Sequence, residues 1–321
     1  MSRVFFQILG VMFATSACIL FKQEACYLFL YGLILGNSLL VLKVIAANGV
    51  GTFIGAAIEQ VVTGGETEIP IMRQLEVHDV TFAIGAYMLF LLIQHRWIKH
   101  VKFKLLISAA LFGIGFKRIA ILSITMLVVV FIVLRTVRPL SKFIMGAAAA
   151  ALMCGSMCYV IIIKDGIFDY LVDKFEINTM GRAGLYDMFK DKFDMSIGFI
   201  GHGAGWTTRL ITQWFEDGVI DHSFGALHND ILTMYLELGF VGFLIWLVVE
   251  LYVKNRIIGI IYGERMEIIT FIVGLYVFIT YFSDNTHFYP CVQTSLYLIP
   301  MGYAFERRER FEKSKHKKKL S

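Results

Sequence analysis

The sequence predicts an all-α fold: a polytopic transmembrane helix bundle of about nine spans, with one large external loop that contains an amphipathic helix. The 321 residues are 57% hydrophobic and only 17% charged, which leaves too little polar surface for a water-soluble domain of this size. Apolar runs recur along the chain without a Gly/Ser-rich or Pro-rich linker, so we expect one transmembrane domain over residues 1–305. These runs are continuous, whereas a transmembrane barrel would need alternating strands.

The expected spans are the apolar segments of suitable length. In chain order they cover residues 4–21, 25–45, 80–95, 104–116, 119–134, 143–163, 231–253, 267–282 and 286–304.

Charge assigns the two sides of the predicted bundle. Residues 306–319 carry eight Lys/Arg against three Glu, an excess equal to the whole net charge of +5. We therefore expect residues 306–321 to be a basic cytoplasmic tail held at anionic membrane lipids, rather than a nucleic-acid-binding tail, because no folded basic surface accompanies it. Nine spans then place the amino terminus outside.

The loops agree with this sidedness. The segments 96–104, 135–142 and 254–267 fall inside, and each holds more basic than acidic residues. Residues 164–230 fall outside, where eleven acidic residues stand against six basic ones.

The apolar stretch 105–134 is interrupted only by Lys117 and Arg118. It is too long for one span and short for two, so we expect a tight helical hairpin with its turn at the outer face. A cation pair at that position is costly unless it is paired or binds an anion, which makes Lys117 and Arg118 candidates for substrate contact.

A 67-residue external segment between two spans is long enough to suggest a function. Its stretch 178–193 places Leu185, Met188, Phe189 and Phe193 on one face of an expected helix, with Asn178 or Thr179 as its cap. Arg182 falls in the first turn of that helix, where a guanidinium could meet an anion.

The stretch GFIGHGAGW, residues 198–206, contains four glycines and His202. A phosphate cradle and a turn with unusual backbone angles both remain open here, because the motif lacks the Lys-Ser/Thr ending of a P-loop. His202 is kept as a candidate for substrate binding.

The sequence His228-Asn229-Asp230 stands directly before an apolar span that contains Glu237. Taken alone, the segment reads as a helix start capped by Asn229 or Asp230. His228 could also be a reactive group, with Glu237 as a partner on the same helix. No H-x-x-x-H or H-E-x-x-H pattern supports a metal site, and no nucleophile elbow supports a Ser-His-Asp hydrolase.

This order of features resembles the O-antigen polymerase and O-antigen ligase superfamily. The motif His228-Asn229, nine further residues and then Gly239-x-x-Gly242 matches the carboxyl-half signature of these proteins. Arg118 in GFKRIAIL and Arg182 in MGRAGLYDMF are similar to the arginines that such proteins carry in an outer hairpin turn and in the external loop.

The start of the segment EVHDVTFAIG is also similar to a family feature. His78 stands where members have His-Pro-Asn, but Asp and Val replace the Pro and Asn.

The resemblance implies glycosyl transfer at the outer surface of a bacterial cytoplasmic membrane, without a metal ion or cofactor. The donor is expected to be an oligosaccharide on polyprenyl diphosphate. The expected catalytic residues are His228 as the base and Arg118 and Arg182 as neutralisers of the diphosphate. Expected substrate-binding residues are Lys117, His202, Asn229 and Glu237. The resemblance also implies a flippase and a chain-length regulator as partners.

These chemical roles suit the residue types. An imidazole with a pKa near neutrality can accept the proton of an attacking hydroxyl, and guanidiniums stay charged beside a diphosphate. Three functions remain as alternatives: a polymerase of repeat units in O-antigen, capsule or exopolysaccharide synthesis, a ligase that uses lipid A-core as acceptor, and a transporter that forms no bond. The candidate residues gather at one membrane face, which favours surface chemistry over transport.

Overall fold

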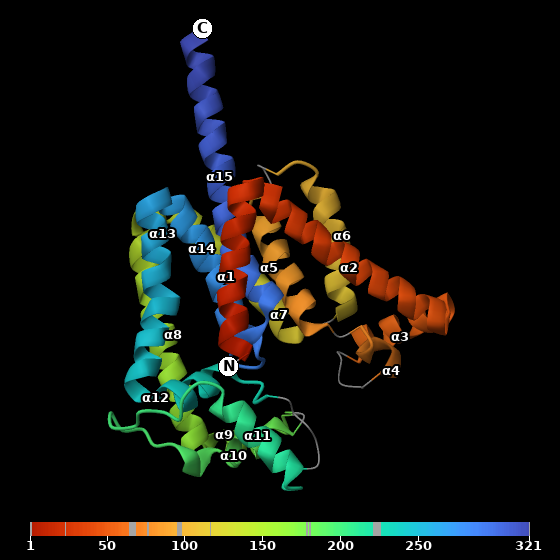
Figure 1. The fold of residues 1–321 in the computed structure, drawn as a ribbon, viewed down its shortest axis with the longest axis vertical. Coiled ribbons are helices and arrows are strands. Elements are labelled where there is room, and N and C mark those ends of the chain that lie inside the picture. The colour runs from red at the N-terminus through yellow and green to blue at the C-terminus, as the bar shows by residue number, and fades with distance from the viewer. Residues whose placement is uncertain are drawn as a thin grey trace.

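The computed structural model describes residues 2–22, 24–63, 69–75, 77–94, 98–115, 117–177, 179, 181–220 and 226–320, with side chains from residue 8 to residue 305 of these ranges except at positions 61 and 138. All regular secondary structure in the described residues is helical (Figure 1). The side chains of the basic tail 306–321, part of the basic loop 96–104 and the predicted cap Asn178 lie outside the described residues.

A helix occupies each of the nine apolar segments, with ends close to the expected ones except at α15, which continues well beyond residue 304. These helices are α1 (Ser2–Phe21), α2 (Glu24–Asn48), α5 (His78–Gln94), α6 (Val101–Gly115), α7 (Arg118–Thr136), α8 (Ser141–Lys164), α12 (Asp230–Val248), α14 (Glu264–Thr280) and α15 (Pro290–Leu320). A short turn, η1 (Arg138–Leu140), joins α7 to α8, and α12 continues through a π-helical turn, η3 (Val249–Val253), into α13 (Lys254–Tyr262).

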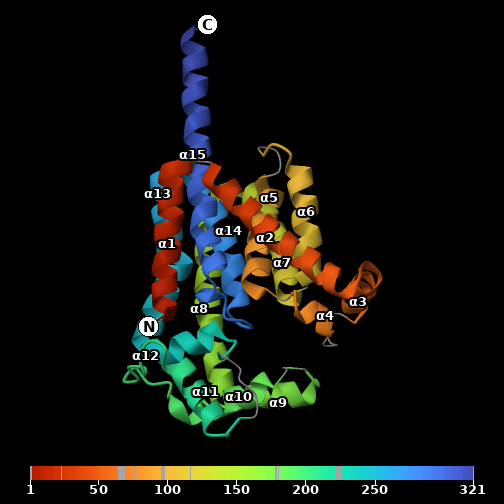
Figure 2. The same cartoon turned by 45° about the vertical axis from the view of Figure 1, so that its right-hand side comes forward.

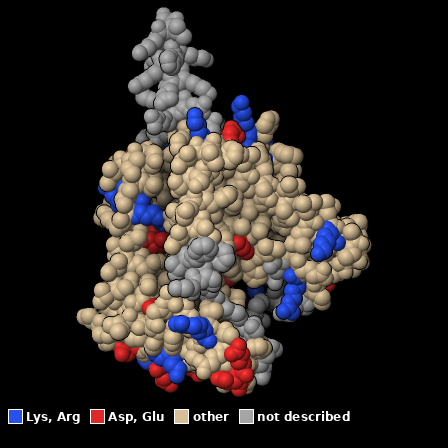
Figure 3. Space-filling view, in the orientation of Figure 1, with Lys and Arg blue, Asp and Glu red and all other residues tan. Residues whose placement is uncertain are grey.

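Among the described residues, four of these helical stretches are both long and apolar enough to cross a membrane, namely α2, α7, α8 and the combined stretch Asp230–Tyr262. Figure 3 shows that, on one face of the molecule, most acidic side chains lie at one end, basic side chains lie at both ends, and uncharged residues cover most of the surface. The chain is therefore a helical integral membrane protein.

The helices α5 and α14 form the centre of the bundle. Both are apolar on all sides and buried along most of their length, as expected for helices surrounded by others. They approach closely because Gly85 leaves room for Tyr276, whose hydroxyl donates to the carbonyl of Phe82 at 3.1 Å.

Two helices lie in a stretch for which we predicted no helix. These are α3 (Val50–Val62) and α4 (Pro70–Arg73), which follow α2 and project from the side of the bundle (Figures 1 and 2). They have a small core of their own, in which Phe53, Met72 and Leu75 are buried.

The described part of segment 164–230 folds at the end of the bundle opposite to the carboxyl-terminal part of α15 (Figures 1 and 2). It contains α9 (Ile167–Lys174), α10 (Arg182–Asp187), the turn η2 (Lys190–Lys192) and α11 (Trp206–Glu216). Phe189 packs against Trp206 and Trp214, with ring centroids 6.0 and 5.0 Å apart, so this segment has an aromatic core.

The helix predicted over 178–193 is shorter than expected. Only Arg182–Asp187 is α-helical, and a 3-10 turn follows at Lys190–Lys192. The predicted apolar face is nevertheless confirmed for Leu185, Phe189 and Phe193, which are buried. The shorter helix lets the chain turn back, so that Phe189 reaches the two tryptophans.

Candidate functional site

The loop between α14 and α15, residues 281–289 with the turn η4 (Thr286–Phe288), forms the centre of the candidate site. Its position is fixed by Asp79, which accepts hydrogen bonds from the backbone N–H groups of Cys291 and Val292 at 3.0 Å each. This capping joins the start of α5 to the start of α15. The short loop is thereby held beside the amino-terminal end of α5.

Asp284 is buried in this loop and lies between two histidines. Its Oδ1 is 3.6 Å from Nδ1 of His228, and its Oδ2 is 3.6 Å from Nδ1 of His78. The hydroxyl of Tyr289 donates to Oδ1 at 2.7 Å. Burial by itself raises the pKa of the Asp284 carboxyl, but the imidazoles of His228 and His78 and the Tyr289 hydroxyl together hold that pKa well below its ordinary value.

His228 stands immediately before α12 and is partly exposed, with 23% of its side chain accessible. Its backbone has a φ of 53°, a left-handed conformation that is uncommon for residues other than glycine. The Tyr186 hydroxyl donates to its carbonyl at 3.3 Å. The backbone is thus fixed from α10, and this sets the direction of the imidazole toward Asp284.

The amide group of Asn285 also faces His228, with Nδ2 placed 3.2 Å from Nδ1. The oxygen and nitrogen of an Asn amide are assigned from its hydrogen bonds, and Oδ1 of Asn285 is buried without a partner in this orientation. Turning the amide would let Oδ1 accept a hydrogen bond from the N–H of Nδ1. Beside the Asp284 carboxylate, this arrangement favours the tautomer in which Nδ1 carries the proton and Nε2 can act as the base.

His78 links Asp284 to the cationic turn between α6 and α7. Lys117 Nζ lies 3.2 Å from His78 Nε2, and because an ammonium group only donates, Nε2 accepts and Nδ1 carries the proton toward Asp284. The chain of contacts therefore runs from Lys117 through His78 and Asp284 to His228. Arg118 is the next residue after Lys117 and its side chain is exposed.

Arg182 reaches the same loop from α10. One of its guanidinium nitrogens donates to the carbonyl of Ser283 at 2.6 Å, and the side chain is partly exposed. A guanidinium has five N–H donors, so this bond orients the group while other donors can serve an anion. Arg182 and His228 thus contact residues 283–285 directly, and Lys117 is joined to them through His78.

Asn229 has a structural place. Its Oδ1 accepts from the backbone N–H of Leu232 at 3.0 Å, which makes it the cap of α12, as one of the sequence alternatives proposed. Its Nδ2 lies 2.9 Å from the Tyr159 hydroxyl, and the side chain is fully buried. Because both the oxygen and the nitrogen of its amide form hydrogen bonds within the protein, we do not retain Asn229 as a substrate-binding residue.

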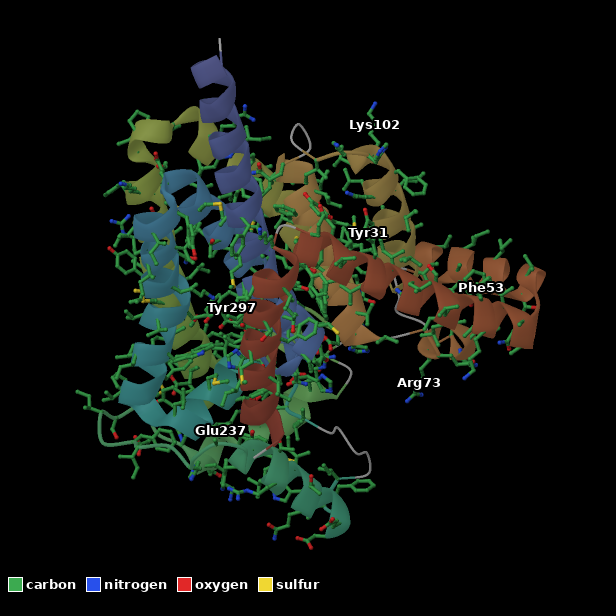
Figure 4. All side chains as sticks on the ribbon, turned by 45° about the horizontal axis from the view of Figure 1, so that its top comes forward. Tyr31, Phe53, Arg73, Lys102, Glu237 and Tyr297 are labelled. Carbon is green, nitrogen blue, oxygen red and sulfur yellow. The ribbon has the colours of Figure 1, made fainter. Side chains whose placement is uncertain are left out.

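Glu237 likewise has internal partners and is not placed beside His228. Its carboxylate accepts from the backbone N–H of Gly205 at 2.7 Å and from the hydroxyl of Thr207 at 2.5 Å. The backbone N–H of Thr207 also donates to this carboxylate, at 3.2 Å, so Glu237 satisfies two N–H groups at the start of α11, where a negative charge is favoured. Figure 4 labels Glu237 at the end of the molecule that holds the segment 164–230. The expectation that Glu237 assists His228 therefore does not fit its contacts.

The stretch GFIGHGAGW is a turn rather than a phosphate cradle. It lies against the kink of α12 at Gly239, where His202 N donates to Leu236 O at 2.9 Å and Phe240 N donates to Phe199 O at the same distance. His202 stacks on Trp206 with ring centroids 3.8 Å apart, and its Nε2 lies 2.6 Å from the carbonyl of Lys192. No bond described for His202 connects it to the Asp284 loop.

Sequence reasoning missed Asp284 and Asn285 and gave no role to His78. The available signal was the polar run Ser283–Asn285 between the last two expected spans, on the predicted side that also holds His228, Arg118 and Arg182. Taken together, the site has an oriented imidazole, a buried carboxylate behind it and several cations around it. Such a site can remove a proton from a hydroxyl and neutralise an anionic leaving group.

Comparison with known proteins supplies one match. The Wzy_C family, described as O-antigen ligase, matches residues 103–247, a segment that runs from α6 into α12 and includes Arg118, Arg182 and His228. No curated protein and no solved structure matches the chain.

Proposed function

Because residues 103–247 belong to the Wzy_C, O-antigen ligase, domain family, which covers both polymerases and ligases, we propose that this membrane enzyme of polysaccharide assembly polymerises lipid-linked repeat units. The observation that carries the proposal is the convergence of His228, Arg182 and Lys117 on the loop around Asp284. The family implies lipid-linked glycans as substrates. The donor is a glycan on polyprenyl diphosphate, and the acceptor is a sugar hydroxyl of a second lipid-linked unit.

The proposed reaction is a single displacement. His228 Nε2 takes the proton of the acceptor hydroxyl while its oxygen forms a bond to the anomeric carbon of the donor. The bond from that carbon to the diphosphate breaks, and polyprenyl diphosphate leaves with the electron pair. Attack from the face opposite the leaving group inverts the anomeric configuration.

The surrounding residues support each part of this reaction. Asp284 orients the imidazole and stabilises it once protonated, as a carboxylate does behind a catalytic histidine. Arg118, Arg182 and Lys117 face the developing charge on the diphosphate, where fixed cations stabilise the transition state more than water does. His228, Arg118 and Arg182 are thus the proposed catalytic residues.

The same proposal covers the membrane layout. Nine helical crossings, made by α1, α2, α5, α6, α7, α8, α12 with α13, α14 and α15, would put the Asp284 loop and the segment 164–230 outside and the basic tail 306–321 inside. Residues 1–305 would then form one transmembrane domain.

Reconstitution in vesicles with a purified polyprenyl-diphosphate repeat unit tests the proposal. Wild type should build longer lipid-linked glycans, and His228→Ala, Arg118→Ala and Arg182→Ala should each lose most of this activity. Two exposed residues outside the site give matched controls, His100→Ala and Arg209→Ala, which should retain it.

The products separate the alternatives. Transfer only when lipid A-core is supplied as acceptor would identify a ligase. Movement of the glycan across the bilayer without a new glycosidic bond would identify a transporter. Full polymerisation by His228→Ala would overturn the assignment of the base.

A further inference from the structure

An apolar groove separates α3 from the hairpin of α6 and α7. Its volume is about 510 Å³, which lies within the roughly 300–1,000 Å³ of small-molecule sites. Phe53, Ala57 and Ile58 line it from α3, and Gly113, Ile114 and Ile121 line it from the hairpin. The surface that it offers is almost entirely apolar, which suits a hydrocarbon chain.

The wall formed by α3 is held in place by its own packing. Phe53 belongs to the small core that α3 shares with the end of α2 and with α4, together with the buried Met72 and Leu75. Ile114 of α6 packs against this core from the other side. Figure 4 shows Phe53 on the helices that project from the bundle. The groove is therefore bounded by two supported walls.

One end of the groove lies at the cationic turn of the hairpin. Gly113 and Ile114 precede Lys117 by three or four residues, and Ile121 follows Arg118 by less than one helical turn. Ala110, the lining residue of α6 that is furthest from the turn, lies about 5 Å further along the helix than Gly113. A chain in the groove would thus end beside Lys117 and Arg118.

We propose that α3 and the α6–α7 hairpin hold the isoprenoid chain of the polyprenyl-diphosphate donor, with its diphosphate at Lys117 and Arg118. This assignment rests on the proposed function, and it gives a role to α3, which lies outside the family match. An apolar groove with cations at one end complements a long-chain anionic lipid. We therefore expect the isoprenoid chain, and not only the diphosphate, to contribute to binding.

Gly113 provides a sharp test, because a Cβ at this position would meet no atom within 4 Å. Gly113→Leu should therefore fill the groove without backbone strain. Gly155→Leu on α8 is the matched control, since Gly155 also has open space around it and lies away from the groove. Ala57→Phe fills the groove from the opposite wall and serves as a second variant if Gly113→Leu does not fold.

Binding is measured by photolabelling with a polyprenyl diphosphate that carries a diazirine in its isoprenoid chain, followed by peptide mass spectrometry. In wild type and Gly155→Leu, label should fall on α3 and α6. Gly113→Leu should reduce this label roughly tenfold, since small changes in an apolar pocket alter binding by that order. A donor with only two isoprene units should be bound equally by all variants.

Three results would overturn the groove assignment: label on other helices, unchanged label in Gly113→Leu and Ala57→Phe, or equal labelling by a diacyl phospholipid probe that a polyprenyl diphosphate does not displace. The assay needs no catalysis, so its outcome is separate from the proposed reaction. Specific label on α3 without any glycan transfer would support the groove assignment and contradict the proposed function. Glycan transfer by wild type with label on other helices would support the proposed function and contradict the groove assignment.

Discussion

The Asp284 carboxylate lies 3.6 Å from His228 Nδ1, although 56 residues separate the two in the chain. Asp284 is nearly inaccessible to solvent, whereas His228 is partly exposed, so the carboxylate stands behind the imidazole and away from solvent. The same carboxylate is 3.6 Å from His78, which contacts Lys117. This buried charge therefore orders the groups that surround it.

Replacing Asp284 with Asn should lower the turnover of glycan transfer by roughly 10²-fold, the lower range for general-base assistance. The amide keeps the size of the side chain but neither stabilises a protonated His228 nor fixes its tautomer. The KM for the donor should change much less, because the carboxylate does not contact the diphosphate in the proposed reaction. Steady-state kinetics on reconstituted enzyme would measure both quantities.

Asp169 provides a comparison, since it is a carboxylate of α9 that pairs with Lys190. Asp169→Asn should leave turnover unchanged. Equal losses in the two variants, or an effect of Asp284→Asn on KM alone, would contradict a positioning role for Asp284.

The acid stability of the protein should also depend on Asp284. Its pKa in the folded protein is lowered well below the ordinary value of 3.8, so the folded state favours the ionised carboxylate. The resulting stabilisation is present above the ordinary pKa and is lost as the pH falls from there through the lowered pKa. Below about pH 4, the difference in apparent Tm between wild type and Asp284→Asn should therefore shrink. Thermal unfolding in detergent over that range would measure it, and a difference that grows with acidification would refute the assignment.

The positions of the apolar helices could be predicted from the sequence because each is encoded by a continuous local run. The nine expected segments all coincide with helices, and their ends differ by only a few residues except for α15. The helix α3 was missed because it has 13 residues, too few for a span, and contains Gly51 and Gly55. Its packing on α4 depends on contacts that no local pattern shows.

The candidate site was only partly predictable for the same physical reason. His228 and Arg182 carried a recognisable local motif, whereas the importance of Asp284 arises from the position of its loop against α5 and His228. Glu237 shares a helix with His228, and helical spacing alone could not show that the segment 198–207 folds back onto it.

Glu237→Gln should destabilise the protein by about 1–3 kcal/mol while leaving transfer by the folded enzyme largely intact. Both oxygens of Glu237 accept hydrogen bonds, so the amide nitrogen of Gln would face a donor at Gly205 or Thr207. Apparent Tm and turnover per folded molecule would separate the two effects. The sequence-based role of Glu237 would be restored if the variant kept its stability but lost turnover.

Thr207→Val tests the same contact by changing its other partner. It removes the hydroxyl that donates to Glu237 Oε1 and should cost about 1 kcal/mol. Because the two residues share a hydrogen bond, the double variant should be less destabilised than the sum of the single variants. Additive losses would show that the contact contributes nothing.

Arg182→Lys should reduce transfer although it keeps the charge. A lysine has no planar fork, so it cannot both hold the carbonyl of Ser283 and present parallel donors to a phosphate. We expect a loss of turnover of roughly tenfold or more. Arg209→Lys on α11 is the matched control, and full activity of Arg182→Lys would indicate that only charge is needed at this position.

The two glycines of the motif Gly239-x-x-Gly242 should differ sharply in their response to alanine. Gly239 has φ 72° and ψ −179°, a conformation that is essentially restricted to glycine, and it kinks α12. A Cβ there would lie 2.3 Å from the backbone carbon of Ile200. At Gly242 an added Cβ would meet only the Leu238 side chain, at 3.0 Å.

Gly239→Ala should therefore cost roughly 3 kcal/mol and lower turnover, because the contact between the kink and the segment 198–207 must open. Gly242→Ala should change stability by only about 1 kcal/mol, since a helical alanine offsets part of the crowding. Apparent Tm and transfer activity measured in parallel would test the pair. Equal tolerance of both substitutions would mean that the kink at Gly239 is not required, whereas selective loss at Gly239 would tie the motif to the bend that follows His228.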